Sequence, residues 1–269
     1  MIKYLKNPFI FIGIVALTAA MILSTFSEST KKMVKNNKDL DRKKNVLLAR
    51  YLEDFKDSNH PYISMLSSEK ELNKLYNSEI EELIFKTDGS QLSSQNKSQF
   101  SDLVWKEDSS PEVGQEGQML YSFKNSNENF LPLFISKSTG GFIIPISGKG
   151  LWSTIKGFIY IIPNNEMNGE FIVKGISFYE HAETPGLGGE IDKYEVKSRY
   201  LDKFISLNDN KSPEMTKSIL DSKYELEYIS GATITSDGLD TFIGYHILDR
   251  YRKILINNNK TLTSEVFYE

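Results

Sequence analysis

The segment Ser230-Gly231-Ala232-Thr233, which continues as Ile-Thr-Ser-Asp-Gly to residue 238, places a small-residue turn and several hydroxyl groups directly before a helical pattern. From residue 239 to 254 apolar residues recur at every third or fourth position, as in a helix with one buried stripe. Residues 235–237 are of types that cap helices. The first N–H groups of such a helix lack intrahelical partners and carry the positive end of its dipole. The segment therefore predicts a helix N-terminus that is either an ordinary cap or a phosphate site.

A second segment, residues 181–190, has the sequence His-Ala-Glu-Thr-Pro-Gly-Leu-Gly-Gly-Glu. Proline fixes one φ angle and glycine permits positive φ, so the segment predicts a turn or loop. Leu187 is its one large apolar side chain. Two interpretations follow: a surface loop between strands, or a backbone surface against which a flat ring can lie.

A third segment, residues 148–153, has the sequence Gly-Lys-Gly-Leu-Trp-Ser. By itself it is typical of a glycine turn beside which Trp152 anchors the core, because tryptophan is usually well buried. In their order along the chain, the three segments resemble the motifs of the FMN-binding subunits of two related respiratory complexes, the Na+-translocating NADH:quinone reductase and the RNF complex. Residues 151–153 are similar to the C subunit of the former, whereas the RNF G subunit lacks Leu-Trp-Ser at this point.

The resemblance covers the N-terminal apolar segment and residues 140–252. It implies an α+β fold: an N-terminal transmembrane helix followed by a soluble FMN-binding domain with an antiparallel or mixed sheet and flanking helices. It also implies that Thr233 carries FMN through a phosphoester bond to its hydroxyl. The family usually has an aspartate three residues before the serine of the tetrad, where this chain has Glu227. The other cofactor-binding residues that the resemblance implies are Ser230, Gly231, Ala232 and Thr235 at the phosphate, and Glu183, Thr184, Leu187, Gly188, Leu151, Trp152 and Ser153 around the ring.

By the same resemblance, the chain is an electron-transfer subunit of a Na+-pumping NADH:ubiquinone oxidoreductase, relaying electrons toward a second covalent flavin on the B subunit. Its implied partners are the other members of a complex of six subunits, especially the B, D and E subunits, the lipid bilayer, and a flavin transferase that uses FAD. The chain itself is expected neither to bind NADH nor to reduce quinone. The alternatives are the G subunit of an RNF ferredoxin:NAD oxidoreductase, and a membrane-anchored binding domain with a degenerate flavin motif.

The N-terminal segment supports a membrane location independently of the motifs. Residues 9–26 contain no charged side chain and are about long enough to cross a hydrocarbon core of roughly 30 Å. A cleaved signal peptide is the competing interpretation, because Lys3 and Lys6 form a positive N-terminal region. We expect residues 1–8 to be cytoplasmic, 9–26 to form the transmembrane helix, 27–60 to form a helical linker, and 61–269 to form the FMN domain.

Charge and family give opposite orientations for this anchor. Seven lysines and arginines lie within residues 31–44, and counting them places the C-terminal domain in the cytoplasm. The resemblance implies a single-pass protein of the bacterial inner membrane with a periplasmic or extracytoplasmic domain. A long domain is translocated largely regardless of its charge, so we follow the resemblance.

Composition excludes several other functions. The chain has 269 residues, 39% of them hydrophobic, and a net charge of −4, which allows one sizeable soluble core and gives no basic stripe for nucleic acid. It contains no cysteine, so it can form neither a disulfide nor a cysteine-ligated iron–sulfur cluster. His60, His181 and His246 lie far apart in sequence, and no metal site and no catalytic residue are predicted.

Short runs rich in Ile, Phe and Tyr, bounded by Gly, Pro and Asn, predict strands at 119–123, 131–135, 142–146, 157–162 and 171–179. A last strand is predicted at 224–229, feeding the Ser-Gly-Ala-Thr turn. Helices are predicted at 40–55 and 194–204. Residues 87–118, which are rich in Ser, Gln, Asp, Glu and Gly, predict loops or an insertion.

Overall fold

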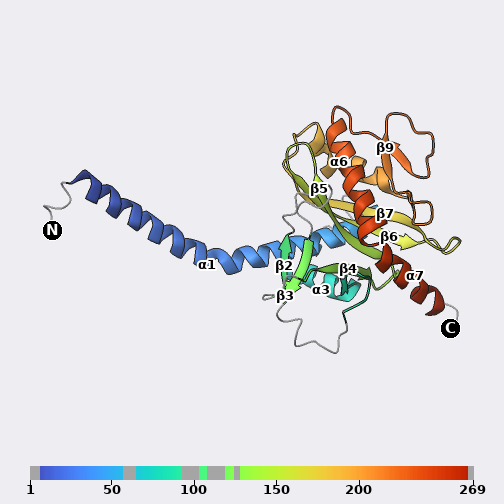
Figure 1. Cartoon of the computed structure of the whole chain (residues 1–269), viewed down its shortest axis with the longest axis horizontal. Helices are drawn as coiled ribbons and strands as arrows, with labels where there is room; N and C mark the ends of the chain where they lie inside the picture. Colours follow the sequence, from blue (N-terminus) through green and yellow to red (C-terminus); the bar gives the residue numbers. More distant parts are fainter. Residues whose placement is uncertain (1–6, 57–64, 93–102, 108–118, 124–127, 266–269) are drawn as a thin grey trace. The chain divides into compact units, whose positions relative to one another are not determined.

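We analysed the chain as a computed structural model, which describes residues 7–56, 65–92, 103–107, 119–123 and 128–265 (Figure 1). The chain divides into two units, Met1–Arg42 and Lys43–Glu269. Helix α1 (Pro8–Arg50) begins in the first unit and ends in the second. Residues 1–6, His60 and most of the predicted loop 87–118 lie outside the described residues.

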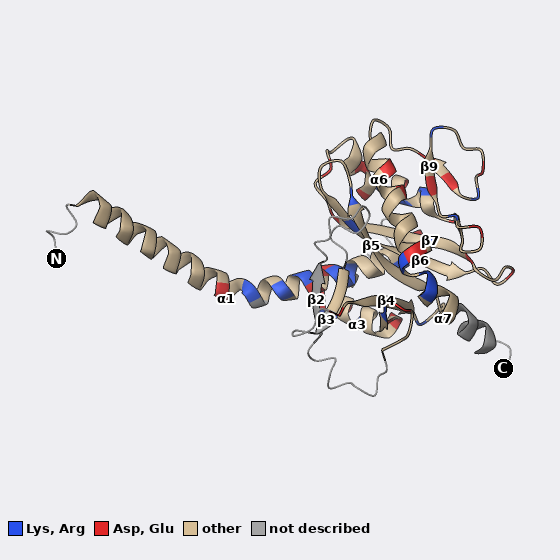
Figure 2. Cartoon of the chain, viewed as in Figure 1, with Lys and Arg blue, Asp and Glu red and all other residues tan. Residues whose placement is uncertain are grey.

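The first part of α1, Pro8–Lys31, is long and apolar enough to cross a membrane. Its large apolar side chains are exposed, as in Phe9 and Phe26, and Figure 2 shows charged side chains only in the later part of the helix. The hydroxyls of Thr18 and Thr25 donate to carbonyls one turn earlier, at 3.0 and 2.9 Å. These polar groups are therefore satisfied within the helix, as a lipid environment requires.

The second unit contains helical elements and strands in the following order. The helical elements are η1 (Glu53–Lys56), α3 (Glu69–Glu79), η3 (Gly188–Asp192), α5 (Tyr194–Lys197), η4 (Ser198–Tyr200), α6 (Thr233–Gly244), the π-helical η5 (Tyr245–Arg250) and α7 (Arg252–Glu265). The strands are β1 (Ile80–Lys86), β2 (Leu103–Glu107), β3 (Met119–Phe123), β4 (Phe130–Ser136), β5 (Phe142–Lys149), β6 (Thr154–Pro163), β7 (Glu170–Glu180), β8 (Phe204–Ser206), β9 (Glu214–Thr216) and β10 (Glu225–Glu227).

Within the described residues, one antiparallel sheet of eight strands forms the centre of this unit. Its order is β2-β3-β4-β5-β6-β7-β8, and β1 also pairs with β4. Strands β5 and β6 pair over eight residues, from Phe142 opposite Ile161 to Lys149 opposite Thr154. Strands β9 and β10 form a separate parallel pair. The α+β fold with an antiparallel sheet and flanking helices is thus confirmed.

The central strands are apolar along almost their whole length because both faces of the sheet are covered. Ile144, Ile159 and Ile176 are cross-strand neighbours on one face, where they share a core with Phe242 of α6. The other face carries Ser177, whose hydroxyl donates to the carbonyl of Asn45 near the end of α1 at 2.8 Å. Each buried side chain of this size contributes about 1.5–3 kcal/mol through its removal from water.

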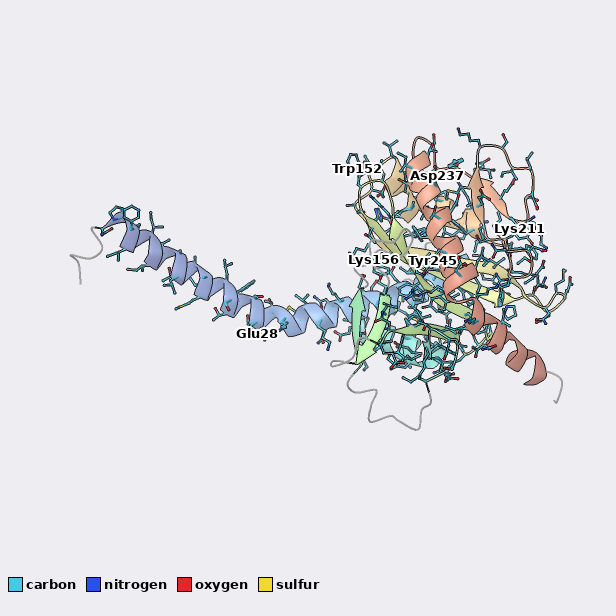
Figure 3. The ribbon with its side chains drawn as sticks, in the orientation of Figure 1. Glu28, Trp152, Lys156, Lys211, Asp237 and Tyr245 are labelled. Carbon is cyan, nitrogen blue, oxygen red and sulfur yellow. The ribbon has the colours of Figure 1, made fainter. Side chains whose placement is uncertain are left out.

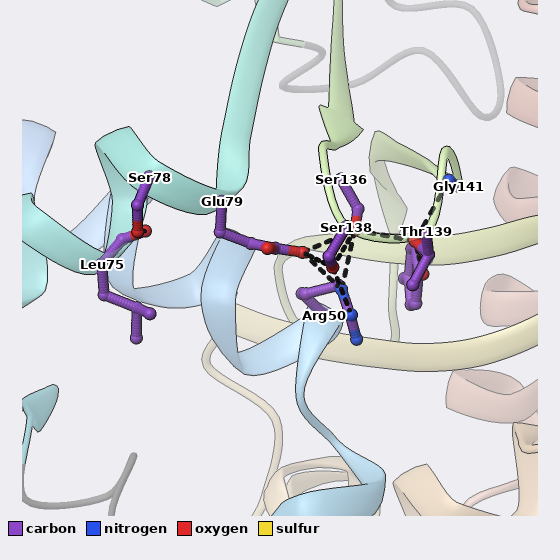
Figure 4. Close-up of polar contacts among 9 residues, drawn as sticks. Arg50, Leu75, Ser78, Glu79, Ser136, Ser138, Thr139 and Gly141 are labelled. Carbon is purple, nitrogen blue, oxygen red and sulfur yellow. Dashed lines mark hydrogen bonds and ion pairs between the residues drawn. The ribbon is translucent and has the colours of Figure 1, made fainter.

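A buried charge network joins the end of α1 to α3 and to the β4–β5 turn (Figure 4). Arg50 donates to the Glu79 carboxylate at 2.9 Å, and the hydroxyls of Ser136 and Ser138 donate to the same oxygen at 2.6 and 2.7 Å. The Arg50 guanidinium also lies 5.1 Å from the ring centre of Tyr160. Burial alone raises the pKa of Glu79, but these hydrogen bonds and the Arg50 charge hold it below its usual value.

The strand predictions between 119 and 179 are confirmed, but three other segments differ from expectation. Residues 103–107, predicted as loop, form β2, because pairing with β3 supplies hydrogen bonds that composition does not reveal. The helix predicted at 194–204 is shorter and ends at Tyr200. The strand predicted at 224–229 is confined to β10 and pairs with β9, outside the main sheet.

Candidate functional site

Helix α6 begins at Thr233, two residues earlier than the capping pattern predicts. Ala232 is the N-cap residue, and its methyl side chain makes no capping hydrogen bond. Thr235 and Ser236, predicted as caps, lie inside the first turns and are buried. The Ser236 hydroxyl donates to the Ala232 carbonyl at 3.0 Å and accepts from the Ile229 N–H at 3.2 Å. The turn is thus held from its interior, and the exposed Thr233 stands at the positive end of the helix.

The turn before the helix depends on Gly231. Its φ is 72°, in the left-handed region, and a Cβ at this position would lie 2.8 Å from Cδ2 of Leu187. Glycine is the residue that adopts this conformation without strain and leaves this space. The glycine therefore brings the 181–190 segment against the Ser-Gly-Ala-Thr turn.

The carboxylate of Glu183 joins all three sequence segments. Its Oε1 accepts from the backbone N–H groups of Trp152 and Ser153 at 3.0 and 3.4 Å. Its Oε2 accepts from the Leu151 N–H at 3.3 Å and from the Thr235 hydroxyl at 2.6 Å. Glu183 and Thr235 are both buried. Four hydrogen bonds to one side chain therefore connect the 148–153 turn, the 181–190 loop and helix α6.

Two glycines leave room for this carboxylate. A Cβ on Gly150 would lie 2.5 Å from Oε1 of Glu183, and a Cβ on Gly188 would lie 2.8 Å from Oε2 and 2.6 Å from the Thr235 hydroxyl. The glycines of the Gly-Lys-Gly and Leu-Gly-Gly sequences thus face the interior of the site. Their neighbour in this structure is the Glu183 carboxylate.

The outer surface of the same region is apolar. Leu151, Trp152, Leu187 and Ile234 are 41%, 69%, 44% and 59% exposed. Trp152 lies at the same end of the unit as the first turns of α6, which carry Asp237 (Figure 3). Trp152 is therefore not the core anchor that its residue type suggests. Exposed apolar side chains grouped beside a helix N-terminus form a surface suited to a ligand with both a flat ring and an anionic group.

The predicted site residues fall into two groups. The exposed ones are Ser230, Gly231, Thr233, Thr184, Leu187, Leu151 and Trp152, and the buried ones are Ala232, Thr235, Glu183 and Gly188. Ser153 is half-buried, and its hydroxyl accepts from the Ala182 N–H at 2.7 Å. Glu227, at the position where the resembled family has aspartate, is exposed, and Arg199 donates to its backbone carbonyl at 3.1 Å.

Sequence reasoning missed a buried polar cluster beside α6. Asp240 accepts from the Met215 N–H at 2.9 Å through Oδ2, while its Oδ1, the Tyr200 hydroxyl and the Thr216 hydroxyl have no hydrogen-bond partner. Burial raises the pKa of Asp240 to about 7, the Met215 hydrogen bond opposes this, and the charges of Glu214 and Asp237 add to it. The polar position of Asp240 on the helix gave no signal of burial.

His246 is a second buried group with an unassigned role. Its Nε2 lies 2.8 Å from the carbonyl oxygen of Ser147 and 3.2 Å from the Ser147 nitrogen, at the end of β5. Burial lowers the pKa of His246 to about 4, against the effect of the Ser147 hydrogen bond. Within the part of the chain that the structure describes, no group of His, Asp and Glu could hold a metal ion. His246 therefore serves packing between η5 and β5.

Comparisons with known proteins identify what this region resembles. Residues 150–245 match the family model of the FMN-binding domain. The chain is 32% identical over 125 residues to the C subunit of the Na(+)-translocating NADH-quinone reductase of Pseudomonas aeruginosa, covering 44% of this chain and 46% of that protein. It is 35% identical over 101 residues to the same subunit of Vibrio anguillarum, covering 36% and 37%. The chain thus spans less than half the length of the curated relatives it matches.

Two crystal structures share the fold. The C subunit of the Na(+)-translocating NADH-quinone reductase of Parabacteroides distasonis aligns with a TM-score of 0.57 at 23% identity, covering 84% of this chain and 96% of that one. Shewanella oneidensis NqrC aligns with a TM-score of 0.51 at 20% identity, covering 71% and 88%. At these identities the likeness establishes the fold.

Proposed function

We infer the function from one premise: residues 150–245 of this chain match the FMN-binding domain family. Its relatives at more than 30% identity are C subunits of Na+-translocating NADH-quinone reductases. We propose that the chain is an FMN-carrying electron-transfer subunit of such a complex. Its partners would be the other subunits, especially those designated B, D and E, and its flavin would relay electrons toward a second covalent flavin on the B subunit.

The observation that carries the proposal is the position of Thr233. Its side chain is exposed at the first residue of a twelve-residue helix whose N-cap has no capping side chain. The N–H groups of the first turn are therefore oriented toward an anion bound there. The apolar surface of Leu151, Trp152 and Leu187 lies across the Glu183 hydrogen bonds from this point. Phosphate at the helix start and a flat ring on the apolar surface fit these residues.

We propose that FMN is linked covalently through the Thr233 hydroxyl. In the linkage the Thr233 oxygen forms a bond to the FMN phosphorus, the hydroxyl proton is released, and the bond from phosphorus to AMP in the FAD donor is broken by a separate flavin transferase. FMN, when bound, supplies electron-transfer chemistry. The chain's own residues hold the phosphate and cover one side of the ring. The covalent bond would keep the cofactor on a domain outside the cytoplasm.

The proposed location is the bacterial inner membrane, with α1 as a single anchor. The exposed apolar surface of Pro8–Lys31 supports the anchor by length and composition. A cytoplasmic N-terminus and a periplasmic FMN domain are part of the proposal, in agreement with the family resemblance and against the lysine and arginine count. The RNF alternative finds no support among the relatives named above.

The test is co-expression of the full chain with a flavin transferase, followed by denaturing gel electrophoresis under ultraviolet light and mass spectrometry. We expect a fluorescent band and an added mass of about 438 Da, the mass of FMN less one water. Thr233→Val should lose both signals. Thr241→Val, which removes another exposed hydroxyl on α6, should keep them. A fluorescent Thr233→Val chain would refute the attachment point.

A further inference from the structure

Every group directed at the Glu183 carboxylate is a hydrogen-bond donor. Three are backbone N–H groups of residues 151–153, and the fourth is the Thr235 hydroxyl. An ionised carboxylate only accepts hydrogen bonds and has about four lone-pair positions, so it satisfies this set. A glutamine would direct its NH2 group at one of the donors. An aspartate would be shorter by one methylene and would not reach both segments.

Glu183 and Thr235 cannot contact a ligand on the exposed surface in this structure. Glu183 is 5% exposed and Thr235 is 1% exposed, whereas Thr233 and Trp152 lie at the surface. Among the described residues, no lysine or arginine forms an ion pair with Glu183. The negative charge is therefore compensated by the backbone of the 151–153 turn and by one hydroxyl.

We propose that Glu183 and Thr235 are positioning residues for flavin attachment. Their hydrogen bond fixes the position of Thr233, two residues before Thr235, relative to the 151–153 turn that carries Trp152. One ligand can then be bonded to Thr233 and lie on Trp152 at the same time. This inference rests on the proposed function and extends it, because it assigns the two buried residues a role without cofactor contact.

The test removes the hydroxyl donor and then restores it. Thr235→Val has nearly the same shape but lacks the donor, Thr235→Ser keeps it, and Thr241→Val is the control on the same helix. Full chains are co-expressed with limiting flavin transferase, and the modified fraction is followed by mass spectrometry. We expect modification at least about 10-fold slower in Thr235→Val and within about 2-fold of wild type in Thr235→Ser, because small displacements of a reacting group are costly.

A purely structural role would give a different result. Thr235→Val would then lower the melting temperature, while the modification rate and the visible circular dichroism of the attached flavin would stay as in wild type. That outcome overturns the inference. Glu183→Gln is the second variant, in case Thr235→Val does not fold, and Glu166→Gln is its control because Glu166 is exposed.

A measurement without flavin separates this inference from the proposed function. The chain has two tryptophans, so Trp105→Phe leaves Trp152 as the sole emitter. Time-resolved anisotropy should show faster local motion of Trp152 in Thr235→Val and Glu183→Gln, and unchanged motion in Thr235→Ser. If wild type is never flavinylated, the proposed function fails, but this result still supports the hydrogen-bond link. Unchanged motion in both variants overturns the link itself.

Discussion

Two buried carboxylates hold different parts of the domain together by different means. Glu79 is bound by the Arg50 guanidinium and two serine hydroxyls, and it joins α1, α3 and the β4–β5 turn. Glu183 is bound by three backbone N–H groups and one hydroxyl. Both are nearly inaccessible to solvent, at 7% and 5% exposure. Burial is therefore the same, and the chemistry that compensates the charge differs.

The difference shows what each network can control. An ion pair such as Arg50–Glu79 depends on two side chains, and loss of either one leaves a buried charge unpaired. The Glu183 network depends on the backbone conformation of residues 151–153, because that conformation directs three N–H groups at one point. Glu79 therefore stabilises the attachment of elements, whereas Glu183 specifies the shape of a loop that carries exposed site residues.

The largest expected effect comes from breaking the ion pair. Arg50→Met leaves Glu79 buried with serine hydroxyls alone, and we expect the free energy of unfolding to fall by about 3–5 kcal/mol. Urea titration monitored by circular dichroism measures it. Lys174→Met, which removes an ion pair with the exposed Asp202, should cost less than about 1 kcal/mol. Equal losses in the two variants would contradict the distinction.

Asp240 extends the comparison to a buried carboxylate with too few donors. Its pKa is raised to about 7, so between about pH 4 and 7 the folded chain holds a proton that the unfolded chain releases, and stability falls as pH rises. Asp240→Asn removes this penalty. We expect its stability relative to wild type to increase by up to about 4 kcal/mol from pH 4 to pH 8, by urea titration. Asp249→Asn, at an exposed position, should show no such trend.

Mild acid should separate the two regions. His246 contacts Ser147, just before the 148–153 turn, and its folded pKa of about 4 lies below the unfolded value. Its stabilising contribution is therefore lost as pH falls from about 6.5 to 4, by up to about 3 kcal/mol. Glu79, whose pKa is lowered, loses its contribution only below about 4.5.

The matching experiment compares unfolding free energies at pH 7 and 5. His246→Gln should reduce the difference between these two values, because a neutral amide has no proton to bind. Glu79→Gln should leave the difference as it is in wild type. If Glu79→Gln instead reduced it, the assignment of the two pH ranges would be wrong.

The smallest expected effect on stability is at Glu227, which is exposed and belongs to neither network. Glu227→Asp restores the residue found in the resembled family and should change the free energy of unfolding by less than about 0.5 kcal/mol. We expect it to accelerate modification by flavin transferase, measured by the rate of mass increase. A slower modification would show that the glutamate is the better residue in this chain.

Local patterns predicted the parts of the fold whose structure depends on nearby residues. The strands between residues 119 and 179 follow from runs of Ile, Phe and Tyr bounded by Gly, Pro and Asn. Strand β2 and the pairing of β10 with β9 were not predictable, because both depend on hydrogen bonds to segments distant in sequence. The start of α6 was predicted two residues late, since Ala232 is a weak capping residue by type.

The sequence by itself determined that three motifs belong to one site, that an apolar segment precedes the domain, and that Thr233 stands at a helix start. Residue type and spacing suffice for these statements, because turns, capping and helix periodicity are local. Only the tertiary structure decided that Glu183 and Thr235 lie behind the surface while Trp152 lies on it. The donors to Glu183 come from residues about 30 and 50 positions away, and their convergence on one carboxylate depends on how the sheet brings those segments together.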